Sequence, residues 1–464
     1  MSMEEDEFEE STSITELNLL NNESEEEPSP TMSVTNEPIQ HAGIYDRSMV
    51  QDHVSIHIES MLCSMPPTSP EHSIFRVRHQ LREVNEKAYD PEILAIGPYH
   101  HGNDKFKSME VQKLRCLQQV LERNKEEGID RYMPTLRELE QQARNCYADT
   151  VDLSQEKFLA MMLIDGCFII EVFRRHFERL MHEWGLHNSI GDLPMHEWGI
   201  HNSIRRDLLL LENQLPLFVL SKLYDLTEEP DNHIEFGLAA SVYFGGPTQN
   251  WTIGEETKHL LHLYHTWHTS SLPETPLPLE TPPPTRKTVK FSATELRESG
   301  VRFKAAQGDK LSDIKFENGT LQIPVLKIGD RTESKFRNLV AFEQYRRRRN
   351  INYFTDYVVF MDSLINSSKD VELLRRVGII KNNLGDDEVV AQMFNRIGDY
   401  VTVSNSYYSE IFQNLNVHCD KRWNVWMAKL RREYFHSPWA FLSILAAIVL
   451  LLLTAAQTVF TILS

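Results

Sequence analysis

Histidine is the residue type whose spacing in this sequence first suggests chemistry. The pairs His182-Glu183 and His196-Glu197 resemble the start of a zinc-protease motif, in which a second histidine follows the first by four residues. Here the second histidines, His187 and His201, follow by five residues, and each stretch contains a glycine. Side chains five residues apart on a helix diverge by about 140°. We therefore interpret neither pair as a zinc site.

Four further histidines recur every three residues, at His259, His262, His265 and His268. Successive rings at this spacing rotate by about 60° around a helix, so neighbours can meet but four rings cannot converge on one ion. We interpret them as ordinary residues of an amphipathic helix. The sequence therefore predicts no metal site and no cofactor.

Motifs of the common enzyme classes are absent. The sequence contains no GxxxxGK[ST] loop, no GxGxxG after a strand and no GxSxG elbow, which removes the best support for nucleotide hydrolysis, dinucleotide binding and esterase chemistry. Asp165, Glu171, Glu212 and His176 lie in or beside apolar stretches and could be acids or bases with shifted pKa values. Buried polar groups that satisfy one another are the favoured explanation. We predict that the protein is not an enzyme and has no catalytic residues.

One catalytic alternative stays open. A membrane-bound enzyme could have an uncatalogued site around Tyr99, His100, His101 and Asp165. The competing interpretation is that His100 and His101 brace a junction between a helix and a loop.

Helical patterns account for most of the chain. Apolar residues at helical spacing predict amphipathic helices over Val111–Arg123 and behind Pro134. Phe158–Phe173 and Asp207–Leu226 are apolar around nearly the whole circumference, so both are expected to be central helices. Pro216 would kink or end the second one, because proline removes a backbone donor.

A short β element is expected in the second half of the chain. Residues of Ser312–Ile328 alternate between apolar and polar on both sides of Asn318-Gly319, a dipeptide that favours a tight turn. The fold class predicted is mainly α, with a helical body, this β-hairpin and one C-terminal transmembrane helix.

A decapeptide is duplicated between the two apolar runs. MHEWGLHNSI at Met181–Ile190 recurs as MHEWGIHNSI at Met195–Ile204. Two short copies are too few for a repeat architecture. We expect a tandem insertion in a surface loop.

The C-terminal segment Pro438–Leu463 has no charged side chain. As a helix of 26 residues it would reach about 39 Å, more than the roughly 30 Å of a bilayer's hydrocarbon core. We predict a membrane anchor that begins at Pro438 and Trp439, is centred near Leu450 and ends at Leu463.

The charges that flank this segment predict its orientation. Five basic residues precede it and only Ser464 follows it, so the positive-inside bias places residues 1–437 in the cytosol. The basic residues are Lys421, Arg422, Lys429, Arg431 and Arg432. We expect a tail-anchored, single-pass protein, with the plasma membrane favoured.

Charge and cysteine content exclude other classes. The formal net charge is −19, and residues 1–46 hold thirteen acidic side chains without a Lys or Arg. The rest of the chain, with 54 acidic and 48 basic residues, has a net charge of −6. The body therefore has no net attraction for phosphate backbones, and no nucleic-acid partner is expected. The five cysteines form no CxxC pair, so we expect reduced thiols rather than a disulfide framework.

Composition divides the chain into parts. Residues 1–70 are predicted to be a disordered acidic leader, with a short helix at Ile14–Leu20. A helical body is expected over residues 71–437, in halves 71–270 and 287–437 that are separated by a Pro-rich linker at 271–286. The anchor occupies residues 438–463.

Several sequence segments of the body resemble those of a known family. In order they include AYDPEILAIGPYHHG (Ala88–Gly102), ARNCYAD (Ala143–Asp149), DLLLLENQLPLFVL (Asp207–Leu220) and TESKFRNLVAFEQ (Thr332–Gln344). The chain resembles the plant "domain of unknown function 247" family from about Ile74 to its C-terminus. Departures include Arg78 where that family usually has proline, the acidic leader, the duplicated decapeptide and the run Arg346–Arg349.

The resemblance implies a plant membrane-associated protein without an established catalytic activity. Some grass relatives are linked to the pollen side of self-incompatibility. We therefore expect a membrane-anchored protein that recognises an unidentified protein partner and contacts the lipid bilayer, with pollen self-incompatibility as one role and growth or stress regulation as another.

Overall fold

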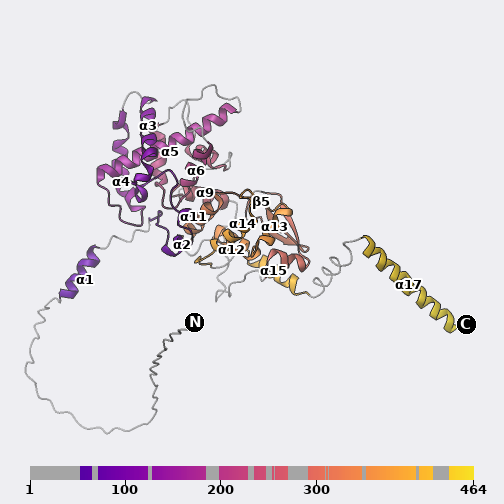
Figure 1. Cartoon of the computed structure of the whole chain (residues 1–464). Coiled ribbons are helices and arrows are strands. Elements are labelled where there is room, and N and C mark those ends of the chain that lie inside the picture. The colour runs from indigo at the N-terminus through magenta and orange to yellow at the C-terminus, as the bar shows by residue number, and fades with distance from the viewer. Residues whose placement is uncertain are drawn as a thin grey trace, which may run out of the picture. The chain divides into compact units, whose positions relative to one another are not determined.

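A computed structural model describes residues 53–64, 72–123, 128–183, 198–227, 235–246, 253–254, 256–269, 291–308, 310–311, 313–346, 352–403, 407–421 and 438–463. Most of these residues are helical (Figure 1), which confirms the mainly α fold class. The α-helices are α1 (His53–Ser64), α2 (His79–Val84), α3 (Lys107–Arg123), α4 (Met133–Asn145), α5 (Gln155–Glu183), α6 (Trp198–Asp207), α7 (Leu217–Thr227), α8 (Phe236–Phe244), α9 (Leu260–Thr269), α10 (Ala293–Glu298), α11 (Thr332–Tyr345), α12 (Tyr353–Leu364), α13 (Ser368–Arg376), α14 (Asp387–Ile397), α15 (Ser409–Asp420) and α17 (Pro438–Leu463).

Short elements complete the described chain. Four 3-10 helices are η1 (Glu86–Ala88), η2 (Pro98–His100), η3 (Asp104–Phe106) and η4 (Gly128–Arg131), and the strands are β1 (Arg302–Ala306), β2 (Lys315–Glu317), β3 (Thr320–Pro324), β4 (Leu326–Ile328) and β5 (Ile380–Asn382). The chain falls into two units, Met1–Met65 and Pro66–Ser464. The described element of the first unit is α1, within the stretch predicted to be a disordered leader. The helix expected at Ile14–Leu20 and the Pro-rich linker lie outside the described residues.

Helix α5 is the centre of the first half of the body. Its apolar run, predicted from Phe158–Phe173, is buried on nearly every side. Helices α3, α4, α7 and α8 pack against it, and Figure 1 shows α3 and α4 beside it. The amphipathic patterns at Val111–Arg123 and behind Pro134 form α3 and α4 as predicted.

The second apolar run is not one helix. Helix α6 ends at Asp207, α7 begins at Leu217, and the residues between them are irregular. The prediction of a helix over Asp207–Leu226 was therefore wrong for residues 208–216, while the expected break at Pro216 is present, because α7 begins directly after it. Side chains replace the missing helical hydrogen bonds: Asn213 Nδ2 donates to the carbonyl of Asp207 (2.9 Å) and Gln214 Nε2 donates to that of Leu210 (2.7 Å).

The duplicated decapeptide is not simply a surface-loop insertion. The first copy begins in the last turn of α5, and the second supplies most of α6, in which Ser203 and Ile204 are buried. The surface-loop prediction is therefore wrong for the described part of the second copy, because its apolar face packs into the core. Residues 184–197, which include most of the first copy, lie outside the described residues.

The predicted β-hairpin is present. Strands β2 and β3 pair antiparallel around Asn318-Gly319, whose φ angles of 51° and 71° are those of a tight hairpin turn. Beyond the prediction, β1 pairs parallel with β3, and β4 pairs parallel with β5 from residues 380–382. These parallel pairings join segments that local patterns do not connect.

One hydrophobic core runs through both halves of the body. It extends from Ile74 to Cys419 and includes buried side chains of α5, α9, α11, α12 and α14. The side chains of Cys116, Cys146, Cys167 and Cys419 are buried in this body. Figure 1 shows α11, α12 and α14 as neighbours.

The C-terminal segment forms the expected helix, α17, over Pro438–Leu463. Its residues Leu450–Leu453 are 64–70% exposed. Among the described residues, however, no helix combines the length and hydropathy needed to span a bilayer.

His259, just before α9, and the histidines of α9 pack at the boundary between the halves. His259 Nε2 lies 3.1 Å from the Ser73 carbonyl, and His265 Nε2 lies 2.8 Å from Glu343 Oε1 on α11. Burial lowers the pKa of His259 to about 3, that of His262 to about 2 and that of His268 to about 4. At neutral pH these three rings are therefore uncharged, the His259 ring fully buried and those of His262 and His268 half-buried. Across the described residues, no group of three His, Cys, Asp or Glu side chains could hold a metal ion.

These low pKa values predict acid sensitivity. Below pH 6.5 the unfolded chain protonates His268 while the folded chain does not, so the free energy of unfolding falls with pH down to about 4. Each pH unit costs about 1.4 kcal/mol per histidine. We expect His268→Phe, which keeps an aromatic ring, to reduce the loss of stability between pH 6.5 and 5.0 by up to about 2 kcal/mol, measured by urea unfolding.

Leu114 supplies the control for this experiment, because its side chain is 51% exposed and has no titratable group. Leu114→Phe should leave the pH dependence of stability unchanged. Equal pH profiles for the wild type and His268→Phe would contradict a neutral, half-buried ring at His268.

Candidate functional site

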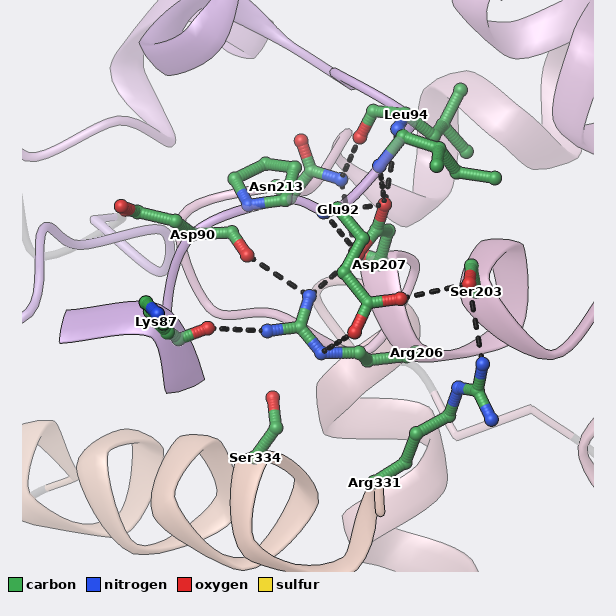
Figure 2. Close-up of polar contacts among 12 residues, drawn as sticks. Lys87, Asp90, Glu92, Leu94, Ser203, Arg206, Asp207, Asn213, Arg331 and Ser334 are labelled. Atoms are coloured by element: carbon green, nitrogen blue, oxygen red, sulfur yellow. Dashed lines mark hydrogen bonds and ion pairs between the residues drawn. The ribbon is translucent and has the colours of Figure 1, made fainter. Parts of the chain in front are cut away.

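The segment from Ala88 to Gly102 runs across the body without long regular structure and is held there by buried side chains. The Asp207 carboxylate accepts the backbone N–H groups of Glu92, Ile93 and Leu94 at 2.9–3.0 Å. Asn213 accepts the N–H of Ile96 at 2.6 Å. It also donates to the Leu94 carbonyl at 2.9 Å (Figure 2). Because these backbone groups are buried or half-buried, each bond avoids the cost of an unsatisfied donor or acceptor.

Arg206 fastens the start of the same segment. Its guanidinium donates to the carbonyls of Lys87 (2.6 Å) and Asp90 (2.9 Å) and pairs with Asp207 (2.7 Å). Figure 2 shows Arg206 between these groups, with its Nε toward Glu92. Burial raises the pKa of Asp207, although the three backbone donors and Arg206 oppose that rise.

The second decapeptide copy and α11 complete this arrangement. Ser203 Oγ donates to Glu92 at 2.7 Å and accepts from Arg331 at 3.2 Å (Figure 2). From α11, Ser334 Oγ and Asn338 Nδ2 both donate to the Ala88 carbonyl, at 2.6 and 2.9 Å. The segment Ala88–Gly102 is therefore held by hydrogen bonds from three parts of the chain: α6, the residues that follow α6, and α11.

The four side chains of the catalytic alternative are distributed over different surroundings. Asp165 is buried, pairs with Lys113 Nζ at 2.7 Å and accepts the Gly97 N–H at 2.9 Å. His100 Nε2 lies 3.9 Å from Glu212 Oε2, and Tyr99 packs edge-on against a tyrosine ring of another segment. His101 is exposed. The structure brings Tyr99 and His100 to one cluster and places Asp165 in an ion pair of its own.

The pKa shifts show what these groups can do chemically. Burial raises the pKa of Tyr99 to about 12 and lowers that of His100. Burial also raises the pKa of Asp165, against the opposing charge of Lys113. At neutral pH Tyr99 keeps its proton and His100 is neutral, so Tyr99 is a hydrogen-bond donor rather than a base.

Glu171 is likewise part of a structural network. It is buried on α5 and paired with Arg123 (2.8 Å), Arg174 (2.7 Å) and Arg175. Burial alone would raise the pKa of Glu171, but the hydrogen bonds and charges of Arg123 and Arg174 outweigh it and lower the pKa to about 2. Glu171 therefore fits the favoured interpretation, in which buried polar residues pair with one another.

Glu212 positions an exposed surface. Its Oε1 accepts the Val77 N–H at 2.6 Å and pairs with Arg82 at 2.8 Å, which fixes the extended residues before α2. Because Val77 points inward, its neighbours Arg76 and Arg78 are exposed. Glu212 is 3% exposed and thus acts from beneath this surface.

Aromatic rings lie directly beside the two arginines. The Arg76 guanidinium carbon lies 4.4 Å from the centre of the Tyr99 ring, and that of Arg78 lies 5.3 Å from the centre of the Tyr345 ring. Phe75 stacks on Tyr345, with ring centres 4.4 Å apart. We call these five residues the Arg76–Arg78 surface. Sequence reasoning missed it: the alternation of Phe75–Arg78 was a signal, but nothing local predicts that Tyr345 would lie beside it.

Gly97 anchors the end of the clamped segment, and its replacement provides a test. Its φ is +73°, and an added Cβ would lie 2.5 Å from the Gln214 carbonyl oxygen. We expect Gly97→Ala to lower the free energy of unfolding by about 3 kcal/mol, from backbone strain plus overpacking. Chemical denaturation of the purified protein measures this.

Gly102 is the matched control, because its φ is +77° but no atom lies within 4 Å of an added Cβ. Gly102→Ala should cost only the backbone strain, about 1–2 kcal/mol. Equal losses for the two variants would show that the close approach of Gly97 to Gln214 does not constrain the segment.

Comparison with known proteins places the chain among plant sequences. A family model described as a plant protein of unknown function matches residues 74–453. The UPF0481 protein At3g47200 of Arabidopsis thaliana is 32% identical over 420 residues, which cover 84% of this chain and 86% of that protein. The putative UPF0481 protein At3g02645 of the same plant is 24% identical, over 83% of this chain and 89% of its own. No solved structure matches the chain. The match over most of its length, from the residues before α2 into α17, shows that the chain belongs to the plant "domain of unknown function 247" family.

Proposed function

We propose that this protein is a binding protein rather than an enzyme, and that its body recognises an acidic segment of a protein partner through the Arg76–Arg78 surface. The observation that carries the proposal is the pairing of two exposed arginines with half-exposed aromatic rings. Arginine, tyrosine and phenylalanine are the types enriched where protein interfaces gain most of their binding energy.

The charges of the surface favour an acidic partner. The Arg76 side chain is 52% exposed and pairs with Asp149 at 2.8 Å, and that carboxylate is itself 50% exposed. Such an exposed pair contributes little to stability, so a partner carboxylate could replace Asp149 at small cost. Arg78 is exposed beside the ring of Tyr345. An incoming carboxylate would therefore meet two guanidinium groups already ordered on aromatic rings.

Hydrogen bonds also hold the backbone of the Arg76–Arg78 surface, so its side chains are positioned before a partner binds. The Tyr345 hydroxyl donates to the Arg76 carbonyl at 2.6 Å, and Glu212 holds the Val77 N–H. Side chains that are ordered before binding lose less conformational entropy on association.

Charge reversal at the surface tests this function. Peptides selected from a random display library on the purified body should be rich in Asp and Glu. Binding of a selected peptide to the double variant Arg76→Glu, Arg78→Glu should weaken at least tenfold, measured by isothermal titration calorimetry, and binding to the wild type should weaken with added salt.

The matched control is Arg115→Glu, Arg137→Glu, which makes the same change of net charge at exposed positions of α3 and α4. It should bind the peptide as the wild type does. Selection of peptides without acidic residues, or equal weakening by the control, would refute the assignment.

We further propose that α17 attaches the body to a membrane, with residues 1–437 on the cytosolic side of the plasma membrane. The support is its length of 26 residues without a charge and the exposure of Leu450–Leu453, rather than a span identified in the described residues. Water-exposed apolar runs of this kind are unusual in soluble proteins.

Leu450→Arg tests the anchor. A charge near the centre of a span costs about 2.5–3.5 kcal/mol of insertion free energy, so the variant should be released from membranes by carbonate while the wild type is retained. Val389→Arg, the same change at a half-exposed site on α14, should be retained. Release of the wild-type chain would exclude the anchor.

For the biological process we propose partner recognition, with pollen self-incompatibility and growth or stress regulation as its two candidate settings. Transcripts confined to pollen support the first setting, and transcripts in leaf or root support the second.

A further inference from the structure

Three aromatic rings from three helices meet at one end of α5. They belong to His176 on α5, His201 on α6 and Tyr243 on α8, and their centres lie 5.1–5.3 Å from one another. His176 and Tyr243 are buried, and His201 is half-buried. His201 comes from the second copy of the duplicated decapeptide.

Two arginines adjoin these rings. Arg179 Nη2 lies 3.2 Å from His176 Nδ1, and the Arg205 guanidinium carbon lies 5.3 Å from the centre of the Tyr243 ring. We call these five residues the His176 cluster. The Nε atoms of Arg179 and Arg205 are buried and make no hydrogen bond within the described structure. Among the described residues, one ion pair involves these two arginines. It joins Arg179 Nε to the carboxylate of Glu183 at 3.8 Å, and the Glu183 side chain is 56% exposed.

The Tyr243 hydroxyl is the second, independent observation. Tyr243 is fully buried, and its hydroxyl has no hydrogen-bond partner in the described structure. Buried polar groups are nearly always paired, because an unpaired one has lost water without a replacement. A buried donor whose ring lies against the Arg205 guanidinium, in a cluster that Arg179 joins through His176, is the arrangement expected of a site for an anion.

The histidines carry the same electrostatic signature. Burial, then the charges of His201 and Arg179, lower the pKa of His176 to about 3. Burial, then Arg205 and Arg179, lower the pKa of His201 to about 4. Both rings are therefore neutral at pH 7, and each keeps one N–H that can donate to an anion.

We propose that the His176 cluster binds a phosphate group. Guanidinium groups match phosphate oxygens in geometry and charge, and the Tyr243 hydroxyl and the two imidazoles supply further donors. A carboxylate offers two acceptor oxygens and one charge, whereas a phosphate monoester offers three oxygens and a charge of about −1.5 to −2, so phosphate matches these donors better. The phosphate could belong to a soluble phosphate or to a lipid headgroup. This site uses none of the residues of the Arg76–Arg78 surface, so the two assignments stand or fall separately.

Tyr243→Phe is the decisive variant because it removes one hydroxyl and keeps the ring. Titration of the purified full-length protein with inorganic phosphate should show binding, and Tyr243→Phe should weaken it roughly tenfold, the effect of a hydrogen bond to a charged group. The stability of Tyr243→Phe without phosphate should not fall, since the lost hydroxyl had no partner. A hydroxyl with only a structural role would leave phosphate affinity unchanged, and that result would overturn the proposal.

Arginine variants and vesicles complete the test. Arg205→Gln should weaken phosphate binding at least tenfold, whereas Arg115→Gln, at an exposed position on α3, should not. Vesicles of phosphatidylcholine with phosphatidic acid distinguish the sources: extra binding over pure phosphatidylcholine that Tyr243→Phe abolishes identifies a headgroup, and binding of inorganic phosphate alone identifies a soluble ligand. Failure of both probes to bind the wild type would reject the site.

Discussion

The body depends on finding partners for buried backbone that is neither helix nor strand. The segment from Ala88 to Gly102 and the segment between α6 and α7 lie against each other, and backbone bonds within each segment satisfy only some of its N–H and C=O groups. Asp207 and Asn213 solve this for the first segment, and Asn213 and Gln214 solve it for the second. A few polar side chains inside an apolar run therefore decide the architecture, since leaving these groups unpaired would cost more than burying the side chains.

The same principle joins the two halves. Asn338 of α11 accepts the N–H of Leu211 and donates to the carbonyl of Ala88, and Glu343 of α11 accepts the N–H groups of Phe354 and Thr355 at the start of α12. Glu343 also meets His265 of α9. Helix α11 thus supplies polar partners to segments of both halves, while its apolar side chains belong to the shared core.

Sequence predicted those elements whose signal is local. The periodicity of Phe158–Phe173 identified α5, and Asn318-Gly319 identified the hairpin, because apolar spacing and turn conformation are properties of short stretches. The run Asp207–Leu226 misled, since Leu208–Leu211 satisfy a helical pattern as well as a buried irregular one. The Arg76–Arg78 surface escaped prediction because Tyr345 reaches Arg76 across 269 residues of sequence. The parallel pairing of β4 with β5 escaped for the same reason.

Some polar groups have all their hydrogen-bond and charge partners within the fold, and others keep donors without a partner. Asp165, Glu171, Asp207 and Glu212 each have their charge matched by a nearby arginine or lysine or by backbone donors, so their burial is explained by structure alone. Binding functions are better sought where pairing is incomplete. The two proposed sites are of this kind: the exposed guanidinium groups of the Arg76–Arg78 surface, proposed for an acidic partner, and the buried Tyr243 hydroxyl, proposed for a phosphate. In a protein without a recognisable catalytic motif, the donors left unpaired after folding are the most direct physical indication of where a ligand would bind.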